Sequence, residues 1–518
     1  MNRREYIKAS LLAAGAVGTR SALSQSGTGA SKHEPFPPPP RRPDGERMPN
    51  ILWICTDQQR ADTIGGFNNP YIHTPRLRRL VDESVTFTNA FAQTPICSPS
   101  RGSFLTGRYP HVTGLRANGQ RIRESERLVT RILADHGYNC GLVGKLHLSP
   151  CADGQLEERI DDGYEFFQWS HDLDDDWPGH NMWRVWLERQ GVTWPRPPKN
   201  FAKTRVWGVP IEPRFTQTAW CAQEVIGFIR EKKSFSPWLM SVNIVQPHHP
   251  FEPTEEYLSH YPADKMPNPI YIEGELASKP QYQMTDHNGA YGGTNVSFAA
   301  ESPEERRETT AAYYAMIEQI DRAVGEMLDA LEETDQLNDT IVIFMSDHGE
   351  MLGDHGIYLK GPYFYDCLTR VPLIVRWPKR FTAGLKVDAL VELVDIAPTL
   401  LEAAGIAVPV GIQGKSLVDL LTGRTTTHRS IVYTEYLDAQ ALFDVPPICS
   451  SIRTDRYKIA YYQGIHTGEL YDLKRDPTET YNLWSSVHHS DVKEEMMEHL
   501  VDTMLSTTDP LPQRRVLW

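Results

Sequence analysis

The stretch Ile-Leu-Trp-Ile-Cys-Thr-Asp-Gln at residues 51–58 decides the fold class of this chain. Its first five residues form a nearly continuous apolar run, which is typical of a strand that helices cover on both faces. The run ends at Asp57 and Gln58, and open α/β sheets place their ligands at the carboxyl ends of buried strands. We therefore expect an α/β fold with Asp57 and Gln58 at its functional edge.

Further apolar runs follow the same pattern along the chain. Each ends at side chains that can bind a ligand or transfer a proton: 138–143 before Lys145 and His147, 238–245 before His248, and 341–345 before Asp347 and His348. A long amphipathic helix, with apolar residues at helical spacing from Tyr313 to Leu331, precedes the last of these strands. We interpret its apolar stripe as core and expect the strand ends to share one edge of a sheet.

The remaining segments define the expected domain organisation. Residues 150–215 and 253–302 are predicted to be long excursions from the sheet that shape a substrate cleft. The end of the chain is rich in short strand patterns and closes with a helix at about 491–505. We predict a catalytic α/β domain over 49–425 and a smaller α+β subdomain over 426–518, made of an antiparallel sheet and one helix.

The N-terminus resembles an export signal. Twin arginines at 3 and 4 precede a short apolar run over 9–18 and the small-residue pattern Ala22-Leu23-Ser24. Twin arginines indicate the Tat route, and the apolar run is too short for a stable membrane anchor. We expect a Tat signal peptide over 1–24, a Pro-rich linker over 25–48 and a periplasmic or secreted protein, with the Tat export machinery as a partner.

Composition restricts the classes of function. The chain has 518 residues, 23% of them charged and 40% hydrophobic, which is ordinary for a folded soluble protein. The net charge of -14 argues against nucleic acid as a partner, because phosphate binding needs clustered Lys and Arg. The seven cysteines form no disulfide framework or metal-binding spacing, although a bridge between Cys140 and Cys151 is left open.

The cysteine at position 97 has an unusual setting. It opens the string Cys-Ser-Pro-Ser-Arg at 97–101, with Leu-Thr-Gly-Arg at 105–108. This string is compatible with a short helix, whose N-terminal N–H groups and dipole favour an anion. A lone cysteine is more often a small buried hydrophobe, but this string suits oxyanion chemistry.

The residues after the first and last strands suit a metal ion. Asp57, Gln58, Asp347 and His348 offer two carboxylates, an amide oxygen and an imidazole. This mostly oxygen set favours a hard divalent cation, Ca²⁺ first, while the imidazole leaves Mn²⁺ or Mg²⁺ possible. A single Asp after a strand is usually a turn or cap residue, so the prediction depends on both pairs lying together.

Basic side chains complete the candidate site. Lys145, Lys360 and Arg101 would supply positive charge for an anionic ester, and His147 and His248 can transfer protons near neutral pH. Taken singly, each histidine would more often be structural and Lys360 a solvated surface residue. The argument therefore rests on their joint placement.

These motifs resemble those of the type I, formylglycine-dependent sulfatases of the alkaline phosphatase superfamily. The string at 97–108 is similar to their signature, in which the cysteine is oxidised to Cα-formylglycine. The segments 144–147, 247–251 and 347–350 resemble their Gly-Lys-Trp-His, Pro-His-x-Pro-Phe and second metal motifs, and 469–483 resembles their C-terminal signature. The resemblance spans 50–483 and implies an alkaline-phosphatase-like fold, a mixed sheet sandwiched by helices.

The resemblance also implies a nucleophile and its maturation. Cys97 would become formylglycine through a formylglycine-generating enzyme and hydrate to a geminal diol, one hydroxyl of which attacks sulfur. Residue 97 would also be a metal ligand, together with Asp57, Gln58, Asp347 and His348. Many family members have Asp at the position of Gln58 and Asn at that of His348.

The remaining roles follow from the same resemblance. His248, with Lys360, would protonate the departing alcohol, and His147 would take the proton of the second hydroxyl to expel sulfate. Arg101 and Lys145 would stabilise the diol and its charge, and Asn118 would contact the sulfate.

Other functions compete with a sulfuric ester hydrolase. A phosphonate or phosphate ester hydrolase on the same fold would use similar metal pairs, although the phosphonate hydrolases that this chain resembles lack the Lys145/His147 pair. A non-catalytic glycan-binding relative is the third reading. The substrate stays open between a sulfated saccharide, an aryl sulfate and choline sulfate. Aromatic residues of the excursions would either stack on sugar rings or pack internally: Trp169, Trp177, Trp183, Trp186, Tyr282 and Tyr291.

Overall fold

A computed structural model describes residues 41–67, 69–152, 154–171, 177–196, 206–231 and 236–512. The predicted signal peptide at 1–24 and residues 25–40 of the predicted linker lie outside the described residues.

A nine-stranded mixed sheet forms the centre of the fold, with the strand order β4-β3-β5-β1-β6-β7-β2-β8 and β9 beside β2. The strand expected over 51–55 is β1 (Asn50–Thr56), in the middle of the sheet. It pairs in parallel with β5 (Trp238–Ile244) and β6 (Thr340–Ser346), and every residue of the three strands is buried. The expected α/β class is therefore confirmed.

The flanks of the sheet extend this centre in both directions. On one side β3 (Asn139–Gly144) pairs in parallel with β5, and β4 (Tyr164–Trp169) forms the edge. On the other side β7 (Arg370–Arg376) runs antiparallel to β6 and to β2 (Val85–Phe91). Two short strands complete it beside β2: β8 (Lys386–Val387) and β9 (Val391–Glu392). The antiparallel β7 is what makes the sheet mixed.

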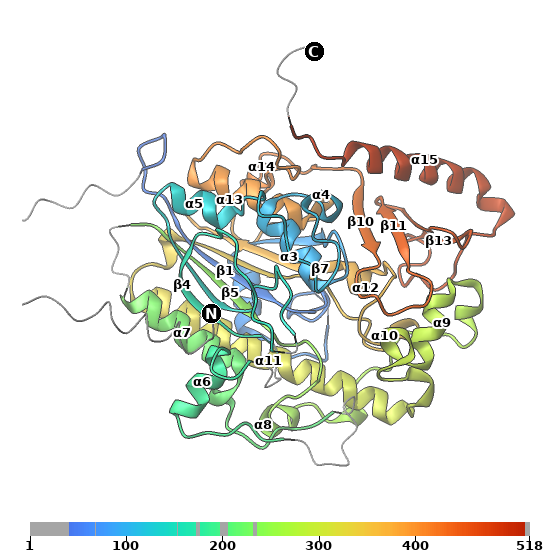
Figure 1. The fold of residues 1–518 in the computed structure, drawn as a ribbon, viewed down its shortest axis with the longest axis horizontal. Coiled ribbons are helices and arrows are strands. Elements are labelled where there is room, and N and C mark those ends of the chain that lie inside the picture. The colour runs from blue at the N-terminus through green and yellow to red at the C-terminus, as the bar shows by residue number, and fades with distance from the viewer. Residues whose placement is uncertain are drawn as a thin grey trace, which may run out of the picture. The chain divides into compact units, whose positions relative to one another are not determined.

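Helices cover both faces of the sheet (Figure 1). One face carries α2 (Pro75–Asp82), α7 (Gln217–Glu231) and α11 (Pro303–Glu333), and the other carries α3 (Cys97–Thr106), α5 (Val129–Asp135) and α13 (Ile396–Ala404). Side chains of a strand alternate between faces, so Leu52 packs with the first group while Ile51 packs with the second. Because the helices on both faces present apolar side chains to the sheet, the sequence of β1 is a nearly continuous hydrophobic run.

The helix α11 has the predicted amphipathic pattern and a defined start. Ser302 accepts from the backbone N–H of Glu305, and the Glu305 side chain accepts from the backbone N–H of Ser302. This capping box satisfies two backbone donors that the first helical turn would otherwise leave unpaired. The predicted stripe from Tyr313 to Leu331 is buried, which confirms it as core.

The C-terminal segment forms a separate four-stranded antiparallel sheet. Its strands are β10 (Val432–Leu437), β11 (Ile448–Arg453), β12 (Tyr457–Tyr462) and β13 (Thr467–Asp472). The last helix, α15 (Ser490–Ser506), packs Met496 and Leu500 on this sheet. The expected antiparallel sheet with one helix is confirmed, and together with the large sheet it makes one compact unit.

The first predicted excursion was partly wrong, because it contains β4, which pairs with β3 as an edge strand of the central sheet. For most of the aromatic residues of the excursions, the structure favours internal packing over stacking on a sugar ring. Trp169, Trp177, Trp183 and Tyr282 are at most 6% exposed, so they pack the protein interior and are not free to stack on a sugar. Short helices lie in the excursions, with α6 (Met182–Arg189) in the first and α8 (Glu255–Leu258), α9 (Gln281–Asn288) and α10 (Ala290–Gly293) in the second. Three further short helices lie outside them: α4 (Pro110–Thr113), α12 (Asp366–Thr369) and α14 (Val418–Leu421).

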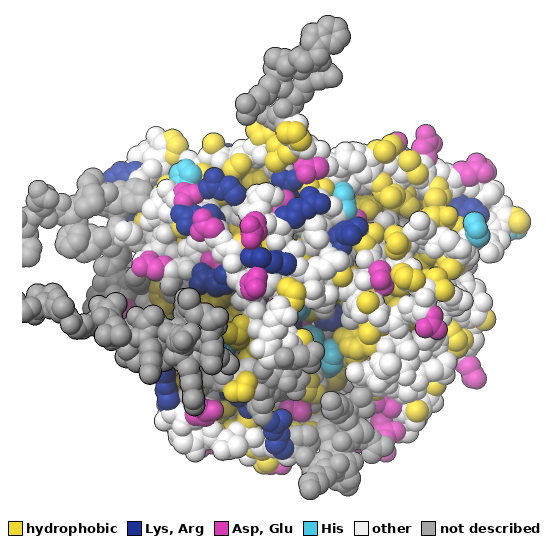
Figure 2. Space-filling model, viewed as in Figure 1, with side chains coloured by type: hydrophobic (Ala, Val, Ile, Leu, Met, Phe, Trp, Pro, Cys, Tyr) yellow, Lys and Arg dark blue, Asp and Glu magenta, His cyan; other side chains and the backbone are white. Residues whose placement is uncertain are grey.

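Three further features of the structure bear on the sequence predictions: the cysteines, the apolarity of the helices and the surface charge. Cys140 and Cys151 are not joined by a disulfide, so the possible bridge between these two described residues is absent. Among the described residues, none of the helices combines the length and apolarity needed to cross a bilayer. Acidic and basic side chains are interspersed on the face shown in Figure 2, without a continuous basic surface among the described residues there.

Gly144 controls how closely β3 approaches β5. It has a φ of +98°, and a Cβ placed there would lie 1.9 Å from the carbonyl oxygen of Asn243. We expect Gly144→Ala to lower the free energy of unfolding by about 3 kcal/mol, since the added methyl group both clashes and strains the backbone. Gly119→Ala is the matched control, because Gly119 has a φ of +79° and open space around its Cβ position. Denaturant unfolding of the two variants measures the difference, and equal losses would contradict a role for close packing.

Candidate active site

Lys360 and two of the predicted metal ligands, Asp57 and His348, surround Cys97, the first residue of α3. Its Sγ lies 2.8 Å from Lys360 Nζ, 3.2 Å from His348 Nε2 and 3.4 Å from Asp57 Oδ1. The cysteine is 1% exposed. Segments that are far apart in the sequence therefore meet in one buried pocket because β1 and β6 end at the same edge of the sheet.

The acidic part of the pocket can hold a cation. The ligand atoms of Asp57, Cys97, Asp347 and His348 all lie within 4.8 Å of one another. His348 Nδ1 donates to the carbonyl oxygen of Gly349 at 2.9 Å, which leaves its Nε2 lone pair directed toward Cys97. Gln58 adds an amide oxygen that accepts from Lys360 at 2.9 Å. This donor set fits a hard divalent cation.

Cations from two segments, Lys145 and Arg101, compensate the carboxylates. Lys145 Nζ lies 2.6 Å from Asp57 Oδ2, and Arg101 Nη2 lies 2.9 Å from Asp347 Oδ2. Burial alone would raise the pKa of Asp57, but Lys145, together with nearby cations, outweighs burial and holds that pKa well below its usual range. Burial opposes the charge on Lys145, but its carboxylate partner raises its pKa overall. The pocket thus contains fixed positive charge in an acidic chain.

The pKa values of the two predicted proton-transfer histidines are lowered in this pocket. Burial lowers the pKa of His248 well below its ordinary value, and His249 and Lys360 lower it further. Burial also lowers the pKa of His147, with Lys145 and His171 as the next contributors. His248 Nδ1 donates to the carbonyl oxygen of His249, so its Nε2 is the nitrogen that can exchange a proton.

The backbone is strained where it delivers these side chains. Gln58, His147 and Leu359 have φ values of 75°, 65° and 65°, a region that residues other than Gly seldom occupy. In return, the backbone N–H of Gln58 donates to Asp347 Oδ1 at 3.1 Å. Strain of this kind persists where surrounding contacts over-determine it, as at functional sites.

Asn118 lies beside the residue that follows Cys97. Its side-chain oxygen accepts from the backbone N–H of Ser98 at 3.1 Å. Asn118 therefore holds the first turn of α3, beside Cys97, and its contact with sulfate stays a prediction.

Sequence reasoning missed Glu350 as a member of the site. Its carboxylate accepts from the Gln58 amide and from the backbone N–H groups of Leu352 and Leu359. It thereby fixes both Gln58 and the segment that carries Lys360. Its position directly after Asp347-His348-Gly349 could have indicated that it belongs to the site, since a carboxylate so close to a strand end lies near the same sheet edge.

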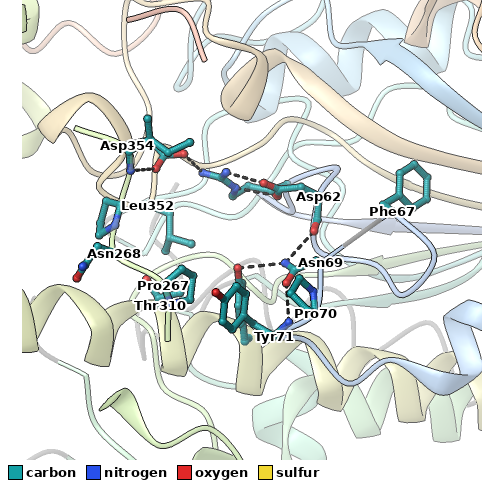
Figure 3. A pocket seen from close by; sticks show the side chains of 14 residues that line it. Asp62, Phe67, Asn69, Pro70, Tyr71, Pro267, Asn268, Thr310, Leu352 and Asp354 are labelled. Carbon is teal, nitrogen blue, oxygen red and sulfur yellow. Dashed lines mark hydrogen bonds and ion pairs between the residues drawn. The ribbon is translucent and has the colours of Figure 1, made fainter. Parts of the chain in front are cut away.

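A cavity of about 250 Å³ is lined by Asp62, Leu352 and Asp354 among other residues (Figure 3). The predicted catalytic and metal-binding residues do not line it. Arg60 in its wall pairs with Asp62 at 2.7 Å and with Asp354 at 2.8 Å. Because its guanidinium is already neutralised by two carboxylates, this cavity is poorly suited to bind the anionic group of an ester.

The arrangement is that of a hydrolase for anionic esters: a reactive position at a helix start, a cation site of mostly oxygen ligands, and lysine and arginine charges in one buried pocket. Comparison with known proteins identifies the class more closely. The family model described as Sulfatase matches residues 49–406, and the model for the C-terminal region of N-sulphoglucosamine sulphohydrolase matches residues 353–506. The chain belongs to the sulfatase family and is a sulfatase with the alkaline-phosphatase-like fold.

Individual relatives agree with this family. The chain is 29% identical to an arylsulfatase of Clostridium perfringens, covering 86% of this chain and 92% of the relative. It is 25% identical to an N-acetylglucosamine-6-O-sulfatase of Bacteroides thetaiotaomicron, over 90% of this chain and 88% of the relative. Among solved structures, a phosphonate monoester hydrolase of Agrobacterium radiobacter superposes with a TM-score of 0.77, at 26% identity over 89% of this chain and 96% of that one. Family membership implies a metal ion and a formylglycine.

Proposed function

We propose that the protein releases inorganic sulfate from a sulfate monoester of a carbohydrate, using a formylglycine derived from Cys97 and a bound Ca²⁺. The observation that carries this proposal is the contact of Cys97 with Lys360, His348 and Asp57 in one buried pocket. A cysteine that only filled space in an apolar core would not need polar and charged groups on three sides. The match to the sulfatase family model supports the same chemistry.

The metal would be held by Asp57, Gln58, Asp347 and His348 together with residue 97. When bound, the metal and the formylglycine supply a fixed positive charge and a hydrated aldehyde as nucleophile. The donor atoms already converge, because the cations Lys145 and Arg101 hold Asp57 and Asp347 in place. We therefore expect the metal to bind without a large rearrangement of the pocket.

The other side chains of the site would compensate the charge of the substrate and transfer protons. Lys145, Arg101 and Lys360 would compensate the negative charge of the sulfate group, which they are able to do because burial strengthens electrostatic interactions. A bound sulfate would also raise the pKa of neutral His248, so that this residue could hold the proton that the leaving alcohol requires. His147, neutral as well, would accept a proton at the step that releases sulfate.

The choice of a saccharide substrate rests on a relative, the N-acetylglucosamine-6-O-sulfatase. A screen of sulfated mono- and oligosaccharides, aryl sulfate and choline sulfate for released sulfate tests it. We expect the highest kcat/KM on a sulfated saccharide. A preference for aryl or choline sulfate would leave the sulfatase chemistry standing but overturn the substrate class.

The second candidate is a phosphonate or phosphate ester hydrolase, which the superposition with the Agrobacterium radiobacter enzyme favours. Paired aryl sulfate, phosphate and phosphonate substrates distinguish the two, with sulfate expected to be preferred. Mass spectrometry of the peptide that contains Cys97 is the companion measurement. Loss of sulfur and gain of an aldehyde are expected, and an unmodified thiol in protein from the native host would favour a non-catalytic relative.

Removal of the metal should abolish most of the activity. We expect dialysis against a chelator to lower kcat/KM at least about 100-fold, since the cation contributes several kcal/mol of charge stabilisation. Ca²⁺ should restore the rate and raise the melting temperature, because a ligand that binds only the folded state stabilises it. Parallel additions of Mg²⁺ and Mn²⁺ identify the preferred ion, and full activity in the chelated protein would contradict the metal site.

A further inference from the structure

Two histidines and a cysteine form a second cluster beside the active site. His147 follows β3 and His171 follows β4, and these strands are parallel neighbours with Gly144 opposite Trp169. Cys151 lies on the loop after His147. The three side chains each offer one ligand atom, and these atoms lie within 4.8 Å of one another. All three residues are at most 8% exposed.

The backbone that carries both histidines is held in place. Glu157 accepts from the backbone N–H of Leu148 and from the indole N–H of Trp169, the latter at 2.8 Å. Ser170 also donates its N–H to the carbonyl oxygen of Gly144 at 3.0 Å. One carboxylate and one backbone bond thus join the ends of β3 and β4, so the spacing of His147 and His171 is preorganised.

The donor chemistry of the cluster points to a specific kind of ion. The His147 and His171 rings lie 4.8 Å apart at 86°, and His147 Nδ1 is buried without a hydrogen-bond partner among the described residues. Burial lowers the pKa of His147, and this direction favours the neutral imidazole, which is the form that ligates metals. Two imidazoles and one thiol are borderline-to-soft ligands that suit Zn²⁺ and not Ca²⁺.

Nearby cations are the main electrostatic argument against a metal here. Lys145 and Arg101 both act on His147. Each is paired, however, Lys145 with Asp57 at 2.6 Å and Arg101 with Asp347 at 2.9 Å. Loss of the Cys151 proton on metal binding would add a negative charge within the cluster itself.

We propose that His147, Cys151 and His171 form a second metal site that binds Zn²⁺ and thereby inhibits the enzyme. Zinc bonds of about 2.0–2.3 Å place tetrahedral ligands roughly 3.5 Å apart, so small side-chain rotations close the cluster around an ion. A Zn–S bond forms as the Cys151 thiol releases its proton to solvent, and water fills the fourth position. Zinc withdraws the His147 lone pair from proton transfer, and this inhibition, unlike the metal binding, rests on the proposed function.

Cobalt substitution tests the metal site without reference to activity. The Ca²⁺-loaded full-length protein is titrated with Co²⁺, and the thiolate-to-cobalt charge-transfer absorption is recorded for wild type, Cys151→Ser and Cys97→Ala. We expect the absorption in wild type and Cys97→Ala, its loss in Cys151→Ser, and its displacement by Zn²⁺. Absence of the band in wild type, or its persistence in Cys151→Ser, would overturn the site.

Two further measurements complete the test. Zn²⁺ should slow alkylation of Cys151 in the wild-type protein at least tenfold, as measured by mass spectrometry, and an unchanged rate would count against the site even if Cys151→Ser fails to fold. Zn²⁺ should inhibit sulfate release by wild type, while Cys151→Ser should require at least tenfold more Zn²⁺. Equal inhibition of both would disprove regulation through this cluster. If no ester releases sulfate, the proposed function fails while the cobalt spectrum still decides the metal site.

Discussion

Replacing Cys97 by alanine is expected to lower the rate of sulfate release by roughly 10⁴-fold or more, the size of effect seen when an enzyme loses its nucleophile. The substitution removes the only atom through which position 97 contacts Lys360, His348 and Asp57. Lys360 Nζ keeps Gln58 Oε1 at 2.9 Å and His348 Nε2 at 3.3 Å, so the pocket should stay assembled. Substrate binding is therefore expected to survive while turnover is lost.

The comparison that makes this result specific is Cys367→Ser. Cys367 is half-buried and its Sγ contacts Met351 Sδ at 3.7 Å, away from position 97. This variant should keep nearly all activity, and both variants should show cooperative thermal unfolding. More than a tenth of wild-type activity in Cys97→Ala would mean that another group attacks the ester and that the proposed chemistry is wrong.

Asp57→Asn should combine a large loss of activity with a loss of stability. Asp57 is fully buried and pairs with Lys145 at 2.6 Å, with Arg101 Nη2 at 3.6 Å. Neutralising it leaves Asp347 alone to face these cations and Lys360. Breaking a buried ion pair from one side costs about 3–5 kcal/mol, and loss of a metal ligand should lower kcat/KM by about 10³-fold.

A surface carboxylate provides the matched control for Asp57. Asp82 pairs with Arg78 at 3.0 Å on α2, with both side chains more than half exposed. Since exposed pairs contribute little, Asp82→Asn should change the free energy of unfolding by less than about 0.5 kcal/mol and leave kcat/KM unchanged. Equal stability of the two variants in denaturant unfolding would show that the Asp57 charge is not needed to hold the pocket.

The sequence predicts which residues follow the buried strands at the carboxyl edge of the sheet, because this depends only on the local pattern of apolar residues. An apolar run such as 51–55 is buried on both faces, and the residue that follows it must emerge at the carboxyl edge. That rule alone predicts that Asp57, Lys145 and Asp347 share one edge of the sheet. The resemblance of the motif around Cys97 supplies the chemistry, which pattern alone leaves open.

Features that depend on packing between distant segments could not be predicted in the same way. The segment with β4 is interpreted from sequence as an excursion although Tyr164–Trp169 is rich in aromatic residues that favour strands. That interpretation misses both the neighbour of β3 and the position of His171. Likewise Trp177 and Trp183 could face either solvent or core on the basis of type alone. Their burial depends on contacts that exist only once the excursion has folded, such as Trp177 with Trp169 and Trp183 with Trp194. Glu350 belongs to a motif that is visible in the sequence, but its contacts with Leu352 and Leu359 involve a loop whose path the sequence does not specify.

The burial of position 97 has a consequence for the timing of synthesis. Lys360 closes over Cys97 from 263 residues further along the chain, and β6 with its Asp347-His348 pair also emerges long after α3. At 5–20 residues per second, the ribosome needs roughly 13–50 s to make that intervening stretch. During this interval the thiol cannot yet be enclosed by its final neighbours. We expect an enzyme that converts Cys97 to act on the nascent chain during this interval, before the folded protein encloses the thiol.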